Sequence, residues 1–191
     1  NAIGVAVVSG NVRRSAEMLL GSHDDEFMEL KNYELNPSRA NVGWASNNSV
    51  IGNVGMNYDV LAEKLADGGE PAVIWLDNMQ AYGRMKDTER NNKDFRVMGV
   101  NPCSEITLED RELCNLCEVI PSNHEDIEDY KKTIKYAYLF AKTITLLNTN
   151  WSSSNKVMLR NRRIGLSLTG ITQFIAQKGL YELKKWMNEG Y

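Results

Sequence analysis

Short apolar runs separated by polar breaks mark the first half of the chain. The runs at 2–9 (AIGVAVVS) and 71–76 (PAVIWL) are rich in small and β-branched residues, which predicts two buried strands. The segment 45–54 (ASNNSVIGNV) predicts a strand with a polar face. The charged stretch 82–94 has no periodic pattern and is most simply an exposed loop.

Helix signals lie between these strands. The acidic stretch 24–31 predicts a short helix with Asp24 or Ser22 as its N-cap. A second helix is predicted at 59–66, and it ends at the glycine pair 68–69, a usual signal of a helix C-terminus. The polar pair Asp77-Asn78 ends the strand that follows.

The second half of the chain carries longer patterns. A strand at 97–100 leads into an irregular segment at 101–105, because Pro102 cannot continue a β-ladder, and a further strand is predicted at 113–120. Helices are predicted at 126–147, at 155–177 with an interruption near Gly165 or Gly170, and at 180–188. Strands that alternate with helices favour an α/β fold.

Length and charge restrict the class of protein. With 191 residues, of which 42% are hydrophobic, the chain can form one domain with a sizeable core. A net charge of -3 gives no general attraction to nucleic acid or to an anionic membrane. No apolar run reaches the roughly 18 residues of a membrane span. The chain begins with an apolar stretch and without Met, and we expect it to be part of a longer polypeptide.

The three cysteines, Cys103, Cys114 and Cys117, lie in one short stretch. An odd number of clustered cysteines does not form a disulfide framework, since such a framework joins distant segments. The pattern favours chemistry or metal binding in a reducing compartment, and therefore a cytoplasmic protein.

The segment NPCSE at 101–105 places an amide, a thiol and a carboxylate two residues apart. In an extended loop, Asn101, Cys103 and Glu105 share one face. A carboxylate raises the pKa of a neighbouring thiol, which disfavours a nucleophilic thiolate but suits an acceptor of a substrate hydroxyl proton. His23 and His124 are distant in sequence, which argues against Cys–His hydrolase chemistry and leaves room for a hydrogen-atom donor.

Two other interpretations of these cysteines stay open on the residues alone. A single Cys in a domain is more often an inert small hydrophobe than a catalyst. A zinc-binding module is the second alternative, with Cys103, Cys114, Cys117 and His124 as ligands. That set contains one C-x-x-C pair, and its surroundings resemble a strand rather than a zinc knuckle.

The motif NPCSE, followed by Cys114-Asn115-Leu116 eleven residues after Cys103, resembles the active-site finger loop of class II ribonucleotide reductases. The family pattern is N-P-C-G-E followed by C-N-L. The resemblance implies that Cys103 becomes a thiyl radical that abstracts the 3′-hydrogen of the ribose, at an enclosed loop tip facing a ribose pocket. It further implies that Glu105 takes the 3′-hydroxyl proton, Asn101 orients the ribose hydroxyls, and Cys114 belongs to the dithiol that reduces the 2′ position.

Further segments match the family in the same order. GNVRRSAE resembles the specificity loop that links the effector site to the substrate base, and its implied residues are Gly10, Asn11, Arg13, Arg14 and Ser15. Guanidinium groups there can pair with phosphates and stack on bases, although a basic loop can also be merely exposed. The segments 43–50, 69–71 and 160–167 also fit. The sequences of the segments that contain Gly10 and Trp44 are most similar to those of monomeric ribonucleoside-triphosphate reductases that use adenosylcobalamin.

Two departures and several absences qualify the resemblance. Ser104 stands where the family usually has Gly, which restricts the backbone, and Cys117 is an extra thiol that we expect to be structural. Upstream of Cys103 the sequence has no cysteine that could pair with Cys114, and it lacks a substrate-phosphate loop of the P-S-G-T kind and a C-terminal shuttle dithiol. We therefore expect residues 1–191 to be an incomplete segment of a catalytic barrel.

The resemblance implies part of a ten-stranded α/β barrel with a central finger loop. It implies adenosylcobalamin as cofactor, a ribonucleotide substrate (a triphosphate is favoured), a deoxynucleotide effector, and a thioredoxin-like reductant or the remaining segments of the same enzyme as partners. From the charge and the lack of a membrane span we expect no nucleic-acid or membrane partner, and we expect no metal ion held by protein side chains. A second hypothesis is a nucleotide-binding or regulatory fragment without catalysis of its own.

Overall fold

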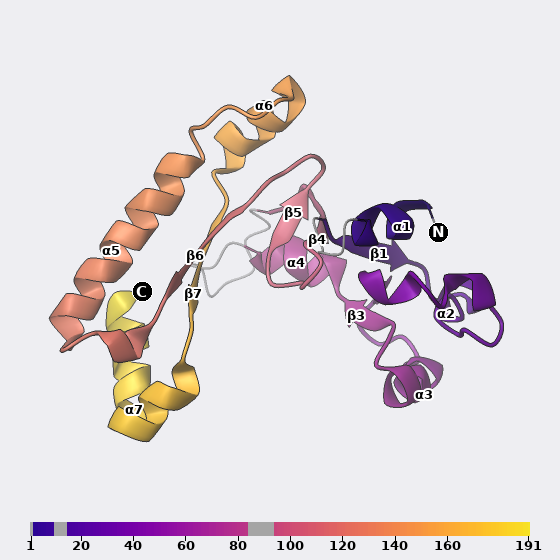
Figure 1. The fold of residues 1–191 in the computed structure, drawn as a ribbon, viewed down its shortest axis with the longest axis horizontal. Coiled ribbons are helices and arrows are strands. Elements are labelled where there is room, and N and C mark those ends of the chain that lie inside the picture. The colour runs from indigo at the N-terminus through magenta and orange to yellow at the C-terminus, as the bar shows by residue number, and fades with distance from the viewer. Residues whose placement is uncertain (1, 10–14, 84–93) are drawn as a thin grey trace. The chain divides into compact units, whose positions relative to one another are not determined.

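The computed structural model describes residues 2–9, 15–83 and 94–191. The chain divides into two compact units, Asn1–Asp110 and Arg111–Tyr191, and each is described by itself (Figure 1).

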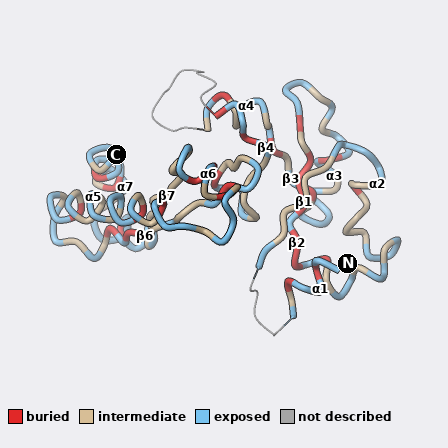
Figure 2. Tube along the Cα trace, turned by 90° about the horizontal axis from the view of Figure 1, so that it is seen from above, coloured by how far each residue is buried: buried red, intermediate tan, exposed pale blue. Residues whose placement is uncertain are grey.

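The first unit contains a parallel sheet of three strands in the order β1-β2-β3. Its strands are β1 (Glu17–Gly21), β2 (Ser46–Ile51) and β3 (Ala72–Ile74). The connections carry α2 (Asp25–Met28), the 3₁₀ turns η1 (Pro37–Arg39) and η2 (Gly43–Ala45), and α3 (Asp59–Gly68). Met28, Val50 and Leu61 form the core between sheet and helices, and most of β2 is buried (Figure 2).

The predicted helix 24–31 is present as the shorter α2, and Asp24 is its N-cap. The Asp24 side chain accepts a hydrogen bond of 2.8 Å from the Phe27 N–H. Ser22, the other candidate cap, instead donates its hydroxyl hydrogen bond to the Asp24 carboxylate. This bond is the main reason that the pKa of Asp24 is lowered.

The prediction of a strand at 2–9 is wrong, because these residues form helix α1 (Ala2–Val8). A short apolar run does not distinguish strand from helix. The two buried residues, Gly4 and Val7, are three apart, as on one face of a helix. A Cβ on Gly4 would lie 3.2 Å from Val42, so its small size allows close packing. Strand β1, which pairs with β2, was not predicted.

The second predicted helix is confirmed as α3, and its end depends on one of two neighbouring glycines. Gly69 caps the helix with φ +74, whereas Gly68 is the last helical residue and has no positive φ. A Cβ on either glycine would meet nothing within 4 Å, so only backbone conformation distinguishes the two positions.

Replacing Gly69 with Ala should therefore destabilise the chain by about 1 kcal/mol, because an L side chain is strained in the left-handed region. Gly68→Ala is the matched control, and it should stabilise by about 0.5 kcal/mol through the unfolded chain. Urea unfolding followed by circular dichroism measures both. Equal effects at the two positions would contradict the assignment of Gly69 as the cap.

The rest of the first unit is a helix packed beside an antiparallel hairpin. The strand β3 ends at Ile74, earlier than the predicted stop at Asp77-Asn78, and these two residues lie inside α4 (Leu76–Tyr82). The hairpin consists of β4 (Val97–Val100) and β5 (Thr107–Glu109). The Gln80 side chain donates to the Val97 carbonyl at 2.9 Å, and Thr107 donates to the carboxylate of Asp94 at 3.0 Å.

The predicted exposed loop 82–94 falls largely outside the described residues, which resume at 94. At that end the prediction is wrong, since Asp94 is only 4% exposed. Its carboxylate accepts from Thr107, and a Cβ on Gly83 would lie 2.5 Å from it, so Asp94 is part of the packing between α4 and the hairpin.

The second unit is a parallel strand pair covered by helices. Strand β6 (Asn115–Val119) pairs with β7 (Ile164–Leu168), and the connection contains η3 (Pro121–Asn123), α5 (Ile127–Ile144) and α6 (Ser152–Asn161). Helix α7 (Ile171–Gly190) follows β7. Residues from β6, α5 and α7 form the core: Val119, Tyr130, Phe174, Leu183 and Trp186. Burial there raises the pKa of Tyr130.

The long helix predicted at 126–147 is confirmed as α5, with Asp126 as its N-cap; its side chain accepts from the Asp129 N–H at 2.9 Å. The helix predicted at 155–177 is partly wrong, because strand β7 lies within it. The interruption does occur at Gly170, which precedes α7 with φ +77. The predicted break before the final helical piece lies at Gly179, whose φ of +87 kinks α7.

The α/β prediction is confirmed, since parallel strands are joined through helices in both units. The strands of the described residues form one three-stranded and two two-stranded sheets, and none of these sheets closes into a barrel. Over the same described residues, no helix combines the length and apolarity that crossing a membrane requires.

Candidate active site

The segment with Cys103 is the tip of the β4–β5 hairpin. The Asn101 N–H donates to the Ile106 carbonyl at 3.1 Å, and the Ile106 N–H donates to Oδ1 of Asn101 at 3.1 Å. The Ser104 N–H donates to the Asn101 carbonyl at 2.9 Å, which makes a tight turn. The predicted irregular segment is thus confirmed, but the expectation of an extended loop is wrong, because these bonds fold the chain back on itself.

The Asn101 amide has a defined orientation. Its Oδ1 accepts from a backbone N–H, so Nδ2 is the group that faces away from this bond. An amide Nδ2 is a hydrogen-bond donor. Asn101 can therefore offer a substrate hydroxyl a donor while its oxygen holds the loop closed.

Cys103 and Glu105 are both exposed in the first unit, with Pro102 and Asn101 half-buried beneath them. The expectation of an enclosed thiol is therefore not met within this unit. Ile106, at the base of the turn, is buried and anchors it.

Ser104 adopts a left-handed conformation with φ 63. The sequence departs from the family's glycine at this residue, and a non-glycine residue in this region is strained. Ser104→Gly should therefore retain or increase stability, by up to about 1 kcal/mol, whereas Ser104→Val should lose about 1–2 kcal/mol. Urea unfolding of the two variants checks this, and a destabilised glycine variant would contradict it.

A second element reaches the turn from the parallel sheet. The side-chain Nδ2 of Asn47, on β2, donates a hydrogen bond to the carbonyl of Pro102, the residue before Cys103. Asn47 belongs to the segment 43–50, which matches the family only by resemblance. The contact joins residues 55 positions apart, and no local pattern signals it.

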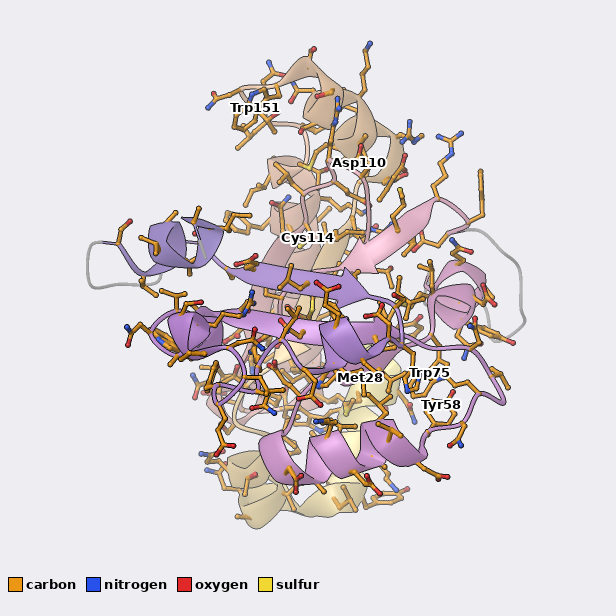
Figure 3. All side chains as sticks on the ribbon, turned by 90° about the vertical axis from the view of Figure 1, so that its right-hand side faces the viewer. Met28, Tyr58, Trp75, Asp110, Cys114 and Trp151 are labelled. Carbon is orange, nitrogen blue, oxygen red and sulfur yellow. The ribbon has the colours of Figure 1, made fainter. Side chains whose placement is uncertain are left out.

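Cys114 lies in the second unit, directly before β6, and is half-buried (Figure 3). The pairing of Asn115 with Ile164 places Cys114 beside the start of β7. There Nε of Arg163 donates to Oε1 of Glu112 at 2.9 Å, and both side chains are buried. Arg163 belongs to the segment 160–167, but its pairing with Glu112 was not predicted from the sequence.

Arg162, the neighbour of Arg163, joins helices α5 and α6. It has φ 51 at the end of α6, and its guanidinium donates to the Lys142 carbonyl at 2.8 Å. Lys142 in turn donates its ammonium to the Arg162 carbonyl at 2.6 Å. These bonds fix the chain where it enters β7, and therefore fix Arg163 opposite the Cys114 segment.

The remaining predicted site residues are described in part. Gly10, Asn11, Arg13 and Arg14 of the specificity loop lie outside the described residues. Ser15 is exposed and lies shortly before β1. The role of this loop stays a prediction.

The zinc alternative gains no support. Cys114, Cys117 and His124 belong to one unit, yet in the part of the chain that the structure describes no three His, Cys, Asp or Glu side chains gather as metal ligands. Cys117 lies within β6, paired with Leu166 and half-buried. Its expected structural role stays a prediction.

A cavity of about 490 Å³ lies at the carboxyl ends of β1 and β2. Ligands commonly bind at this edge of parallel sheets. Its lining is Gly21, Ser22, His23, Ile51, Asn53, Met56 and Asn57. Tyr58 and Trp75, which lie next to each other in Figure 3, are joined by a 3.0 Å hydrogen bond and support the 53–57 loop, because the Tyr58 hydroxyl donates to the Asn53 carbonyl.

Residues 53–183 match the family model of the ribonucleotide reductase barrel domain, which covers more than half of the chain. The chain belongs to the ribonucleotide reductase family. A "probable adenosylcobalamin-dependent ribonucleoside-triphosphate reductase" of Dictyostelium discoideum is 55% identical over the whole chain, and the adenosylcobalamin-dependent ribonucleoside-triphosphate reductase of Euglena gracilis is 53% identical. The chain spans about a quarter of the length of each of these relatives.

A solved structure supports the same assignment. The crystal structure of a B12-dependent (class II) ribonucleotide reductase matches 93% of this chain with a TM-score of 0.79 and 35% identity, and the match spans 24% of that protein. The family resemblance inferred from NPCSE and C-N-L is therefore confirmed. The roles of Cys103, Glu105, Asn101 and Cys114 stay predictions.

Proposed function

We propose that this chain is a catalytic-barrel segment of an adenosylcobalamin-dependent ribonucleoside-triphosphate reductase, which reduces ribonucleotides to 2′-deoxyribonucleotides. The observation that carries the proposal is the hairpin tip, where Cys103 and Glu105 are exposed together above an Asn101 whose Oδ1 is already bonded. The closely similar relatives named for this reaction support it.

The proposed first step takes place at Cys103. A thiyl radical on its sulfur takes the 3′-hydrogen atom of the ribose, which forms an S–H bond and leaves a carbon radical at C3′. Glu105, as a carboxylate, accepts the 3′-hydroxyl proton. The Asn101 Nδ2 donates to a ribose hydroxyl and orients the ring. The 2′-hydroxyl then leaves as water, with one of the two protons that the reducing dithiol supplies.

The proposed reduction uses two thiols. Cys114 and a partner cysteine together supply two electrons and two protons at the 2′ position and end as a disulfide. The hydrogen atom taken at the start returns from Cys103 to C3′, and Glu105 returns its proton to the 3′ oxygen. A thioredoxin-like reductant, or other segments of the same enzyme, would reduce the disulfide for the next cycle.

Adenosylcobalamin fits the geometry of the tip, because Cys103 is exposed on a narrow turn that a bulky cofactor can approach. When bound, this cofactor supplies the oxidising radical through homolysis of its cobalt–carbon bond. The chain's own contribution is to hold the thiol, carboxylate and amide in place. We further propose a deoxynucleotide effector acting through Arg13 and Arg14, and a cytoplasmic location, without a nucleic-acid or membrane partner.

A chimera tests the proposal. The 192 aligned residues of the Dictyostelium relative are replaced by this chain, and deoxynucleotide production is assayed with and without adenosylcobalamin. We expect turnover that depends on the cofactor and on a dithiol reductant. A chimera that folds like its parent and binds nucleotide, yet makes no deoxynucleotide, would instead support a nucleotide-binding fragment without catalysis.

A further inference from the structure

The β4–β5 hairpin is attached to one face of the parallel sheet in the first unit. A Cβ on Gly99, in β4, would lie 2.8 Å from the Leu20 side chain in β1. Leu20 pairs with Ser49 and Met18 pairs with Asn47, so Leu20 and Asn47 point to the same face of the sheet. The hairpin therefore contacts this face at two places, through Gly99 near its middle and through the Asn47 bond at its tip.

The Asn47 bond acts on the peptide group that precedes Cys103. Two backbone bonds and one bond from the Ile106 N–H to the Asn101 side chain close the turn, and they involve only residues 101, 104 and 106. They set the shape of the turn but do not fix it relative to the sheet. The Asn47 Nδ2, donating to the Pro102 carbonyl, joins the turn to β2 and limits rotation of the Pro102–Cys103 peptide.

We infer that Asn47 is a positioning residue for the Cys103 thiol, acting through the Pro102 carbonyl. This inference rests on the proposed function. Hydrogen abstraction requires the reacting atoms at near-contact distance, and a displacement of about 1 Å can cost about a hundredfold in rate. A side chain that holds the peptide next to the sulfur therefore affects the chemical step without touching the substrate.

Asn47→Asp and Asn47→Ala test this in the 191-residue chain. Asp is nearly isosteric but places a carboxylate, which cannot donate, against a carbonyl. We expect hydrogen exchange of the Ser104 and Ile106 amides to become about two- to tenfold faster in both variants, the factor that matches one net hydrogen bond. The amides between β1 and β2 should be unchanged, which also shows that the sheet is folded.

Asn41→Ala is the matched control, because Asn41 is an exposed asparagine of the same unit that lies in the turn before η2. It should leave the exchange of Ser104 and Ile106 at the wild-type rate. If both Asn47 variants also exchange at that rate, the inference is overturned. Accelerated exchange across the whole first unit would also overturn it, because Asn47 would then stabilise the unit generally rather than the turn.

In the Dictyostelium chimera, Asn47→Asp should lower kcat about tenfold or more with little change in KM. A raised KM with unchanged kcat would overturn the positioning role and indicate substrate binding. Failure of the proposed function would look different, because the chimera with the unchanged chain would make no deoxynucleotide, or its Cys103→Ala variant would retain turnover, whatever the exchange rates of the Asn47 variants.

Discussion

Cys103→Ala should abolish deoxynucleotide production in the chimera, with a loss of about a thousandfold or more. The reason is that the methyl group cannot carry the unpaired electron that takes the 3′-hydrogen, and no neighbouring side chain in the turn offers a thiol. Stability should change by less than about 0.5 kcal/mol, since the replaced side chain is exposed at a hairpin tip. Steady-state turnover and urea unfolding measure the two quantities.

Cys117→Ala is the matched control for the loss of a thiol. Cys117 lies inside β6, opposite Leu166, and we expect it to serve packing alone. Its replacement should cost about 1 kcal/mol of stability and leave kcat unchanged. If turnover survives in Cys103→Ala but disappears in Cys117→Ala, then the assignment of the radical to Cys103 is wrong and the proposed mechanism is contradicted.

The sequence predicted those features of the fold that depend on neighbouring residues. Asp24 and Asp126 cap helices because a side-chain oxygen accepts from an N–H three residues ahead, and this can be read locally. Gly69 ends α3 for an equally local reason, its left-handed backbone. The long amphipathic pattern of α5 fixed its type and approximate ends.

The features that sequence analysis missed depend on partners far along the chain. Residues 164–168 fit a helical pattern, but the register with β6 makes them a strand. Residues 2–8 are equally compatible with strand and helix, and the close approach of Gly4 to Val42 favours the helix. In both cases the local sequence pattern is nearly as compatible with a strand as with a helix, and tertiary packing selects one of the two conformations.

The candidate site also combines features that could be predicted from neighbouring residues with features that depend on distant partners. The position of Cys103 on an irregular turn followed from Pro102 and from the family motif. The left-handed Ser104 agrees with the family's usual glycine. The Asn47–Pro102 bond and the Glu112–Arg163 pair could not be predicted in this way. The first joins residues 55 positions apart, and the second joins residues 51 positions apart.

The buried ion pair beside Cys114 gives the second large expected effect. Glu112→Ala should destabilise the 191-residue chain by about 3–5 kcal/mol, because it removes the carboxylate from a guanidinium whose side chain is only 8% exposed. Urea unfolding followed by circular dichroism measures the change. Glu128→Ala is the matched control, since it removes one carboxylate that pairs with Lys131 on the surface of α5, and it should cost less than about 0.5 kcal/mol.

Replacing both members of the pair separates charge burial from packing. Glu112→Leu together with Arg163→Met should recover most of the stability that either single change loses, because neither charge is then buried. The pair also holds the start of β7 against the segment that carries Cys114, through the register of Asn115 with Ile164. The double variant should therefore be stable, yet its Cys114 should react with an alkylating reagent at a changed rate. Wild-type reactivity in a stable double variant would show that the pair contributes to stability alone.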